Sequence, residues 1–177
     1  KRLQQTSKPI VVTVNSAFAA SLTTGNPVYD AGMVVKGSAS QRYVLDGAGG
    51  RIPVRASAAI SDLGLSTSIV KVSNTVLAGF AVQPTFSEFT TCGGTAYVAG
   101  SGKLTPIDPA VAGTVSVSAL ADPLCAVLAL GSTQADPVLL YDRTTHAVYE
   151  VVAGQKHKVT NWSTAKKTHV ALSVDHA

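Results

Sequence analysis

The sequence predicts an α+β fold in which short antiparallel β-meanders and short helices form three similar units, packed as a repeat array. Composition is the first reason, because only 14% of the residues are charged and 46% are hydrophobic, whereas about 25% charged residues is usual in soluble domains. The second reason is a strand–turn–strand pattern that begins at a tyrosine three times, at Tyr43, Tyr97 and Tyr149. The third is a Val-x-Val pair that precedes each pattern. A period of roughly 50 residues is typical of a repeat protein.

Each tyrosine pattern predicts a β-hairpin, because a glycine-containing turn separates two runs of strand-forming residues. The three hairpins are expected at residues 43–54, 97–107 and 149–160. A further strand is expected before each of them, at residues 33–36, 88–91 and 138–141. Each unit therefore contains a three-stranded antiparallel meander.

Short helices are expected after the Val-x-Val pairs, because Asn15, Ser73 and Ser118 follow these pairs and are good N-caps. These helices are expected at residues 16–21, 74–77 and 119–130. Helices that close the meanders are expected at residues 57–63, 108–112 and 163–170. Gly64 is a typical C-cap glycine for the first of them.

Combining these patterns divides one compact domain into three units. The units are expected at residues 12–67, 68–114 and 115–172, with frayed termini at 1–8 and 173–177.

The charge of the chain is mild, with a formal value of +4, a pI near 9.2 and 6% aromatic residues. A nucleic-acid-binding protein normally concentrates Lys and Arg on one face with aromatic residues between them, so no nucleic-acid partner is expected. The apolar runs are too short for a membrane span, and no signal peptide is recognisable. If the protein is exported, we expect its signal or its membrane anchor to lie upstream of this sequence.

The two cysteines, Cys92 and Cys125, predict one disulfide, because an even number of cysteines occurs here in a chain of otherwise extracellular composition. Two buried free thiols are the alternative. In the chain-entropy model the bond stabilises the fold by roughly 3–4 kcal/mol. No Cys or His spacing indicates zinc.

No motif for catalysis or for a cofactor is present. The run Gly100–Lys103 suggests a phosphate loop, but Tyr97 and Leu104 stand where that loop needs Gly and Ser or Thr. The acidic residues mostly occupy turns and caps. We therefore expect no enzyme activity and no cofactor, although a pair of carboxylates across a cleft is visible only in a structure.

The histidines all lie in the last 32 residues, at His146, His157, His169 and His176. The first two flank one hairpin and could bind a metal ion or respond to pH. Exposed strand histidines are the simpler interpretation, and no metal site is predicted. Similarly, the repeated tyrosines could stack on sugar rings, but a core position in each unit is the simpler interpretation.

A longer pattern runs through the first unit: an aromatic strand, glycine and a basic residue in the turn, Pro-Val in the next strand, then Ser and Leu-Gly at the helix. Its residues are Tyr43, Gly49, Arg51, Pro53, Val54, Ser57, Leu63 and Gly64. The second unit keeps Tyr97, Gly102, Lys103, Pro106 and Ile107, and the third keeps Tyr149, Gly154, Lys156, Val159, Trp162 and Ser163.

This pattern resembles the envelope-associated β-hairpin repeats of secreted actinobacterial proteins. Those repeats accompany peptidoglycan hydrolases, and related ones occur in the periplasmic components of type VII secretion. The resemblance implies a non-catalytic module in an extracytoplasmic location, either secreted or membrane-anchored. Its expected partners are cell-wall polysaccharide, peptidoglycan or envelope proteins.

Basic side chains in or just after the hairpin turns are the candidate ligand-binding residues. They are Arg51, Lys103 and Lys156, joined in the last unit by Lys158 and Trp162. If the units stack in register, these residues share one edge and form a cationic rim for anionic envelope polymers. The simpler interpretation is that turns carry Lys and Arg because turns are solvated. The alternative function is an envelope hydrolase or an inhibitor built on the same scaffold.

Overall fold

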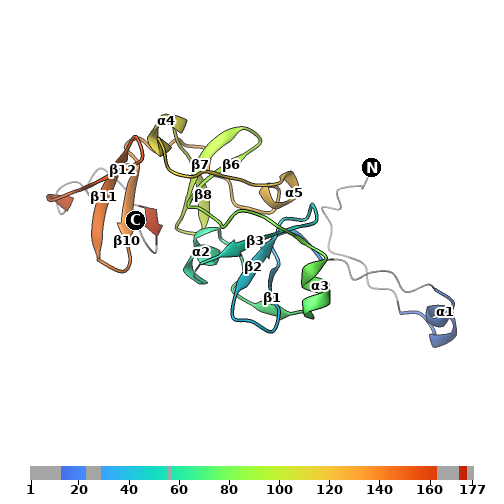
Figure 1. The fold of residues 1–177 in the computed structure, drawn as a ribbon. Helices are drawn as coiled ribbons and strands as arrows, with labels where there is room; N and C mark the ends of the chain where they lie inside the picture. The colour runs from blue at the N-terminus through green and yellow to red at the C-terminus, as the bar shows by residue number, and fades with distance from the viewer. Residues whose placement is uncertain (1–12, 23–28, 56, 163–171, 175–177) are drawn as a thin grey trace.

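The computed structural model describes residues 13–22, 29–55, 57–162 and 172–174 (Figure 1). Within these residues the chain folds into three small β-sheets and a few short helices. The predicted α+β class is therefore confirmed. The predicted helix at 163–170 lies outside the described residues.

Sheet A is formed by residues 34–82 and has the strand order β4-β1-β2-β3-β5. Its strands are β1 (Val34–Lys36), β2 (Arg42–Leu45), β3 (Gly50–Val54), β4 (Ile69–Lys71) and β5 (Ala81–Val82). The first three strands form the expected antiparallel meander, whereas β4 pairs with β1, and β5 with β3, in parallel.

Sheets B and C each contain an antiparallel meander and one parallel strand. Sheet B has the order β8-β7-β6-β9, with β6 (Phe89–Cys92), β7 (Thr95–Gly100), β8 (Lys103–Pro106) and β9 (Ser118–Ala119). Sheet C has the order β12-β11-β10-β13, with β10 (Leu139–Asp142), β11 (Ala147–Val152), β12 (Gln155–Lys158) and β13 (Leu172–Val174). Residues 173 and 174, expected in a frayed terminus, thus belong to a strand.

The parallel strands β4 and β9 follow a closing helix and return to the first strand of the meander that precedes them. The sequence pattern placed the Val-x-Val residues at the start of the following unit. The strand pairing instead places β4 and β9 in the sheet of the preceding unit. A parallel pair needs a crossover connection, and the closing helices α2 (Ser57–Asp62) and α4 (Pro109–Ala112) supply it.

The three tyrosines occupy matching places in the cross-strand register. Each lies in the middle strand of its meander, and the row of residues through each tyrosine crosses four strands. The rows are Val70–Val35–Tyr43–Pro53 in sheet A, Ser118–Thr90–Tyr97–Pro106 in sheet B, and Leu172–Leu140–Tyr149–Lys158 in sheet C.

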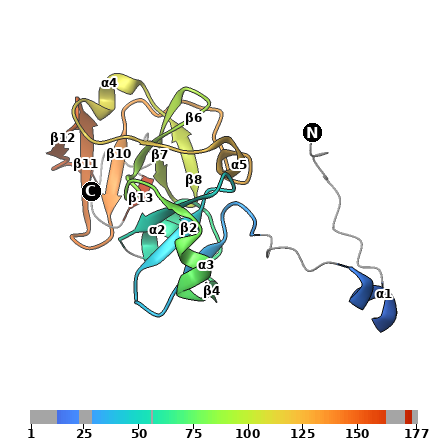
Figure 2. The same ribbon diagram turned by 45° about the vertical axis from the view of Figure 1, so that its right-hand side comes forward.

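Two shared cores join the sheets, with sheet B in the middle (Figure 2). The first core lies between sheets A and B and includes Val44 and Tyr97, together with Ile60 of α2. The second lies between sheets B and C and includes Val98 and Val151, as well as Ala112 of α4. A smaller cluster on the outer face of sheet A is covered by α3 (Asn74–Ala78) through Leu77.

The helix caps follow the sequence closely in four places. Asn15, Ser73 and Asp108 each accept a backbone N–H at the start of α1 (Ser16–Ser21), α3 and α4, and Gly64 follows α2 with a φ of +72°. The predicted helix at 119–130 is wrong in extent, because only α5 (Asp122–Cys125) is helical there. Ser118 belongs to β9 instead. Pro123 lies in the first turn of α5, because proline fits the first turn but not a helix interior.

Cys92 and Cys125 form the predicted disulfide, with a Cα–Cα distance of 5.7 Å. The bond joins the end of β6 to α5, and Leu124 of α5 is fully buried in the core between sheets A and B. None of the helices in the described part of the chain has the length and apolar composition of a membrane span.

Candidate functional site

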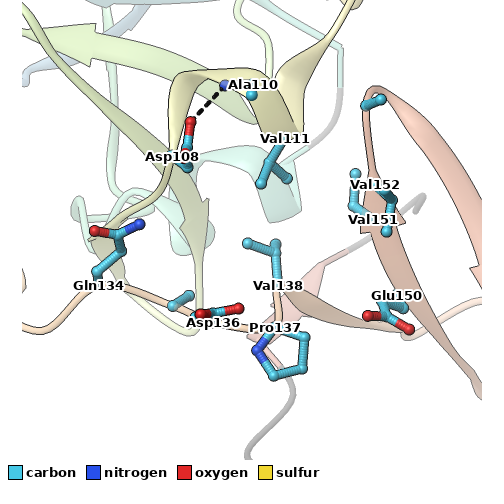
Figure 3. A pocket seen from close by; sticks show the side chains of 12 residues that line it. Asp108, Ala110, Val111, Gln134, Asp136, Pro137, Val138, Glu150, Val151 and Val152 are labelled. Carbon is cyan, nitrogen blue, oxygen red and sulfur yellow. Dashed lines mark hydrogen bonds between the residues drawn. The ribbon is translucent and has the colours of Figure 1, made fainter.

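A cavity of about 360 Å³ opens at the junction of sheets B and C (Figure 3). Its walls come from three segments that are distant in sequence: the start of α4, the loop 134–138 and the end of β11. Val111, Val138 and Val151 supply an apolar floor. Two of these valines, Val138 and Val151, belong to the core that joins the two sheets, so the cavity lies against that core.

Three carboxylates surround this apolar floor: Asp108, Asp136 and Glu150. The Asp108 carboxylate is already used, because its Oδ1 accepts the backbone N–H of Ala110 at 2.8 Å and caps α4. Figure 3 shows Asp136 and Glu150 on either side of Pro137. Asp136 is exposed and Glu150 is half-buried.

A cavity lined by carboxylates and by apolar valine side chains suits a ligand that carries a positive charge and some apolar surface. Two carboxylates across a cleft are also what a glycoside hydrolase requires. No metal-binding cluster of three or more His, Cys, Asp or Glu side chains occurs within the described ranges.

Among the candidate basic residues, Arg51 and Lys156 occupy matching places and contact the repeated tyrosines. Arg51 lies across from Leu45, and its guanidinium group is 4.9 Å from the centre of the Tyr43 ring. Lys156 lies across from Val151, and its ammonium group is 4.8 Å from the centre of the Tyr149 ring. Such cation–π contacts contribute about 0.5–1 kcal/mol at exposed sites.

Arg51 also donates a hydrogen bond of 2.7 Å from Nη1 to the carbonyl of Leu77 in α3. Its charge is therefore engaged by the fold.

Lys103 does not share the place of Arg51 and Lys156. In sheet B that place belongs to Leu104, which lies across from Ala99 and is fully buried. Lys103 is exposed one residue earlier, across from Gly100. The role of these residues in ligand binding stays a prediction.

Lys158 and Trp162 lie at the outer side of sheet C. Lys158 is exposed on β12 and pairs with Tyr149, and Trp162 is half-buried shortly after that strand. These two residues complete the candidate set in the final unit.

His146 and His157, the pair suggested by the sequence, have different surroundings in the structure. The Tyr141 hydroxyl and His146 Nδ1 form a hydrogen bond at 2.9 Å, whereas His157 is exposed on β12 across from Glu150. His169 and His176 lie outside the described residues. Among the tyrosines, Tyr97 is buried in the first core, and Tyr43 and Tyr149 are half-buried.

A second cavity, of about 400 Å³, lies at one end of sheet A and was missed by the sequence analysis. Its lining is Ser40, Gln41, Arg42, Val54, Arg55 and Ser57. Arg42 stands directly before Tyr43, and Arg55 directly after Pro53-Val54, so both flank elements that the sequence pattern did identify. Counting basic residues at strand ends, as well as in turns, would have found them.

No family model matches the chain, and no curated protein matches it.

Proposed function

We propose that this chain is a non-catalytic extracytoplasmic repeat module that binds an anionic cell-wall polymer or organises an envelope protein complex. The observation that carries the proposal is that the two junctions between the sheets share one kind of close contact, a glycine against the turn of the next hairpin. Arrays of small, similar units bury their cores between neighbours and present extended surfaces for binding.

The glycine after each closing helix lies against the turn of the next hairpin. A Cβ added at Gly64 would collide with the carbonyl oxygen of Gly102, and one at Gly113 would collide with that of Ala153. At the second junction the N–H of Gly154 also donates a 2.6 Å hydrogen bond to the carbonyl of Val111. Together with the matching tyrosine rows, this supports three units packed as a repeat array.

The extracytoplasmic location is supported by the disulfide between Cys92 and Cys125, because such bonds persist mainly in oxidising compartments. A surface that is poor in charge, with only 14% charged residues overall, fits a module that meets polymers through hydroxyl groups and a few cations. The proposed partners are peptidoglycan, its attached polysaccharides or envelope proteins, as the resemblance of the hairpins implies.

Retention on purified cell wall tests the proposal. Walls that keep their anionic polymers and walls stripped of them are incubated with the intact chain over a range of salt concentrations. We expect retention on the first, weaker retention on the second, and loss with rising salt, because exposed charges are screened. Absence of retention on both walls at low salt would refute wall binding.

An envelope hydrolase or an inhibitor is the second candidate, and the observation that favours the hydrolase is the cavity flanked by Asp136 and Glu150. The same incubation with cell walls distinguishes a hydrolase from a non-catalytic module. Soluble wall fragments that appear with the wild type, but not with an Asp136→Asn, Glu150→Gln variant, would support the hydrolase and overturn the non-catalytic proposal.

A further inference from the structure

Three cations stand side by side across sheet A. Lys36 pairs with Lys71 between β1 and β4, and Val35 lies opposite Tyr43, so the next pair along these antiparallel strands places Arg42 opposite Lys36. Arg42 in turn pairs with Val54 of β3. We call Lys36, Arg42 and Lys71 the cation row.

The cation row lies on the face of sheet A that packs against sheet B. Each of its residues is two positions along its strand from a residue that packs in the core between these sheets, namely Val34, Val44 and Ile69. Side chains two positions apart in a strand share a face. The row therefore forms the edge of the core, where Lys36 and Arg42 are half-buried and Lys71 is exposed.

Like charges on neighbouring strands destabilise a sheet. Among the residues that the structure describes, no ion pair joins Lys36, Arg42, Arg55 or Lys71 to a carboxylate. Other arginines of the described chain are engaged by the fold, since Arg51 contacts Tyr43 and Leu77, and Arg143 pairs with Asp62.

The fold itself does not require charge at these positions, as the other two sheets show. The matching row of sheet B is Ala119–Thr91–Ala96, and that of sheet C is Ser173–Tyr141–Val148. Both rows are uncharged. The cations of sheet A are thus a local feature of one unit rather than a requirement of the meander.

A cavity adjoins the cation row. Arg42 lines the cavity of about 400 Å³ together with Arg55, Ser40 and Ser57. Gln41 closes one side, because its Nε2 donates to the carbonyls of Arg42 and Val54 at 2.8 and 3.0 Å. Two arginines and two serines, whose side chains are hydrogen-bond donors, therefore line one cavity.

We propose that the cation row and the adjoining Arg42–Arg55 cavity form a binding site for an anionic group, a phosphate or a carboxylate, carried on a carbohydrate polymer. This inference rests on the proposed function and gives it a site. A planar guanidinium group can donate two parallel hydrogen bonds to two oxygens of one phosphate or carboxylate group. The cavity is larger than a bare anion needs and falls within the range of small-molecule sites, so it has room for the sugar that carries the charge.

The first experiment measures NMR shift changes of the intact, isotope-labelled chain during titration with inorganic phosphate, glycerol 3-phosphate and N-acetylmuramic acid. We expect changes concentrated at the Arg42 and Arg55 guanidinium N–H groups and at amides near Lys36. A stronger response to glycerol 3-phosphate than to N-acetylmuramic acid identifies the phosphate polymers, and the reverse identifies the carboxylate sugars. Shifts spread evenly over all basic residues would overturn the site.

Two variants with equal loss of charge sharpen this test. Lys36→Thr with Arg42→Ala installs the residues of the matching sheet B row, and Lys1→Gln with Lys8→Gln removes two charges near the start of the chain, outside every candidate site. We expect the first variant to weaken phosphate binding roughly tenfold or more and the second to weaken it far less. Equal weakening would show that net charge alone attracts the anion, and the site would be rejected.

The melting temperature of the first variant separates binding from a structural role. Because repulsion is removed, we expect it to stay equal to that of the wild type or to rise. If the first variant does not fold, Arg55→Gln on an exposed strand end takes its place, and unchanged phosphate binding in that variant would likewise reject the site.

The outcomes also distinguish this site from the proposed function. In one outcome, the cell wall does not retain the chain, but phosphate causes NMR shift changes that disappear in the Lys36→Thr, Arg42→Ala variant. This result would support the anion site and reject wall binding. In the other outcome, the cell wall retains wild type and variant equally, and phosphate causes no NMR shift changes at the cation row. This result would support wall binding and reject the anion site.

Discussion

Glycines mark the places where a closing helix meets the turn of the next hairpin. Gly64 and Gly113 have φ values of +72° and +56°, a region that side chains other than glycine rarely adopt. They also lie so close to the neighbouring backbone that a Cβ would meet the carbonyl oxygens of Gly102 and Ala153. Each glycine thus serves both the end of its helix and the contact between units.

Gly64→Ala tests the contact, and Gly94→Ala is the matched control. Gly94 has a φ of +83° and nothing within 4 Å of an added Cβ, so its replacement causes only backbone strain of about 1–3 kcal/mol. For Gly64→Ala we expect a further loss of about 1–3 kcal/mol from the collision. Urea unfolding of both variants measures the difference, and equal losses would show that the approach of the two units contributes nothing.

The disulfide acts at the scale of elements, because it attaches the short helix α5 to the end of β6. A helix of four residues has little stability of its own. Its position depends on burial of Leu124 and Leu128 in the core between sheets A and B and on the bond to Cys92. The disulfide therefore supports the junction between sheets A and B, to which Gly64 also contributes.

Replacing both cysteines, Cys92→Ala with Cys125→Ala, should lower the free energy of unfolding by about 3–4 kcal/mol, because the bond closes a segment with a sequence separation of 33. Reductant should destabilise the wild type by a similar amount and leave the variant unchanged. Thiol counting on unreduced, denatured wild type should give no reactive thiol. Two thiols per chain would contradict the bond and weaken the assignment to an oxidising compartment.

At the scale of the whole molecule, the sheets are joined by more than a linear chain of neighbours. Sheet B shares one core with sheet A and another with sheet C. In addition, Arg143, which follows β10 of sheet C, pairs with Asp62 of α2 at 2.7 Å. Asp62 is only 1% exposed, and a buried carboxylate needs such a partner. The first and last thirds of the chain are thereby connected directly.

Because the cores are shared, we expect one cooperative unfolding transition. The single tryptophan, Trp162, follows β12 and reports on sheet C, whereas far-UV circular dichroism reports on the whole chain. The two urea midpoints should coincide, and Gly113→Ala, at the junction of sheets B and C, should lower both together. A tryptophan midpoint at clearly lower urea would mean that sheet C unfolds independently.

The local structure could be predicted from the sequence because its determinants are close together in the chain. The caps at Asn15, Ser73 and Asp108 depend on residues two or three positions away. The hairpins at the three tyrosines depend on turns of a few residues, as at Gly102 and Gly154, where glycine adopts positive φ. The disulfide followed from the number of cysteines alone.

Only the tertiary structure decided which elements meet. The parallel strands β4 and β9 return to the meander before them, and a one-dimensional pattern cannot show this, because a strand of two or three residues carries the same alternation wherever it pairs. For the same reason the sequence selected Arg51 and Lys156 as candidate ligand residues, although the fold stacks both on tyrosines. Lys71 lies 35 positions after Lys36 in the sequence and becomes its neighbour only through the register of sheet A.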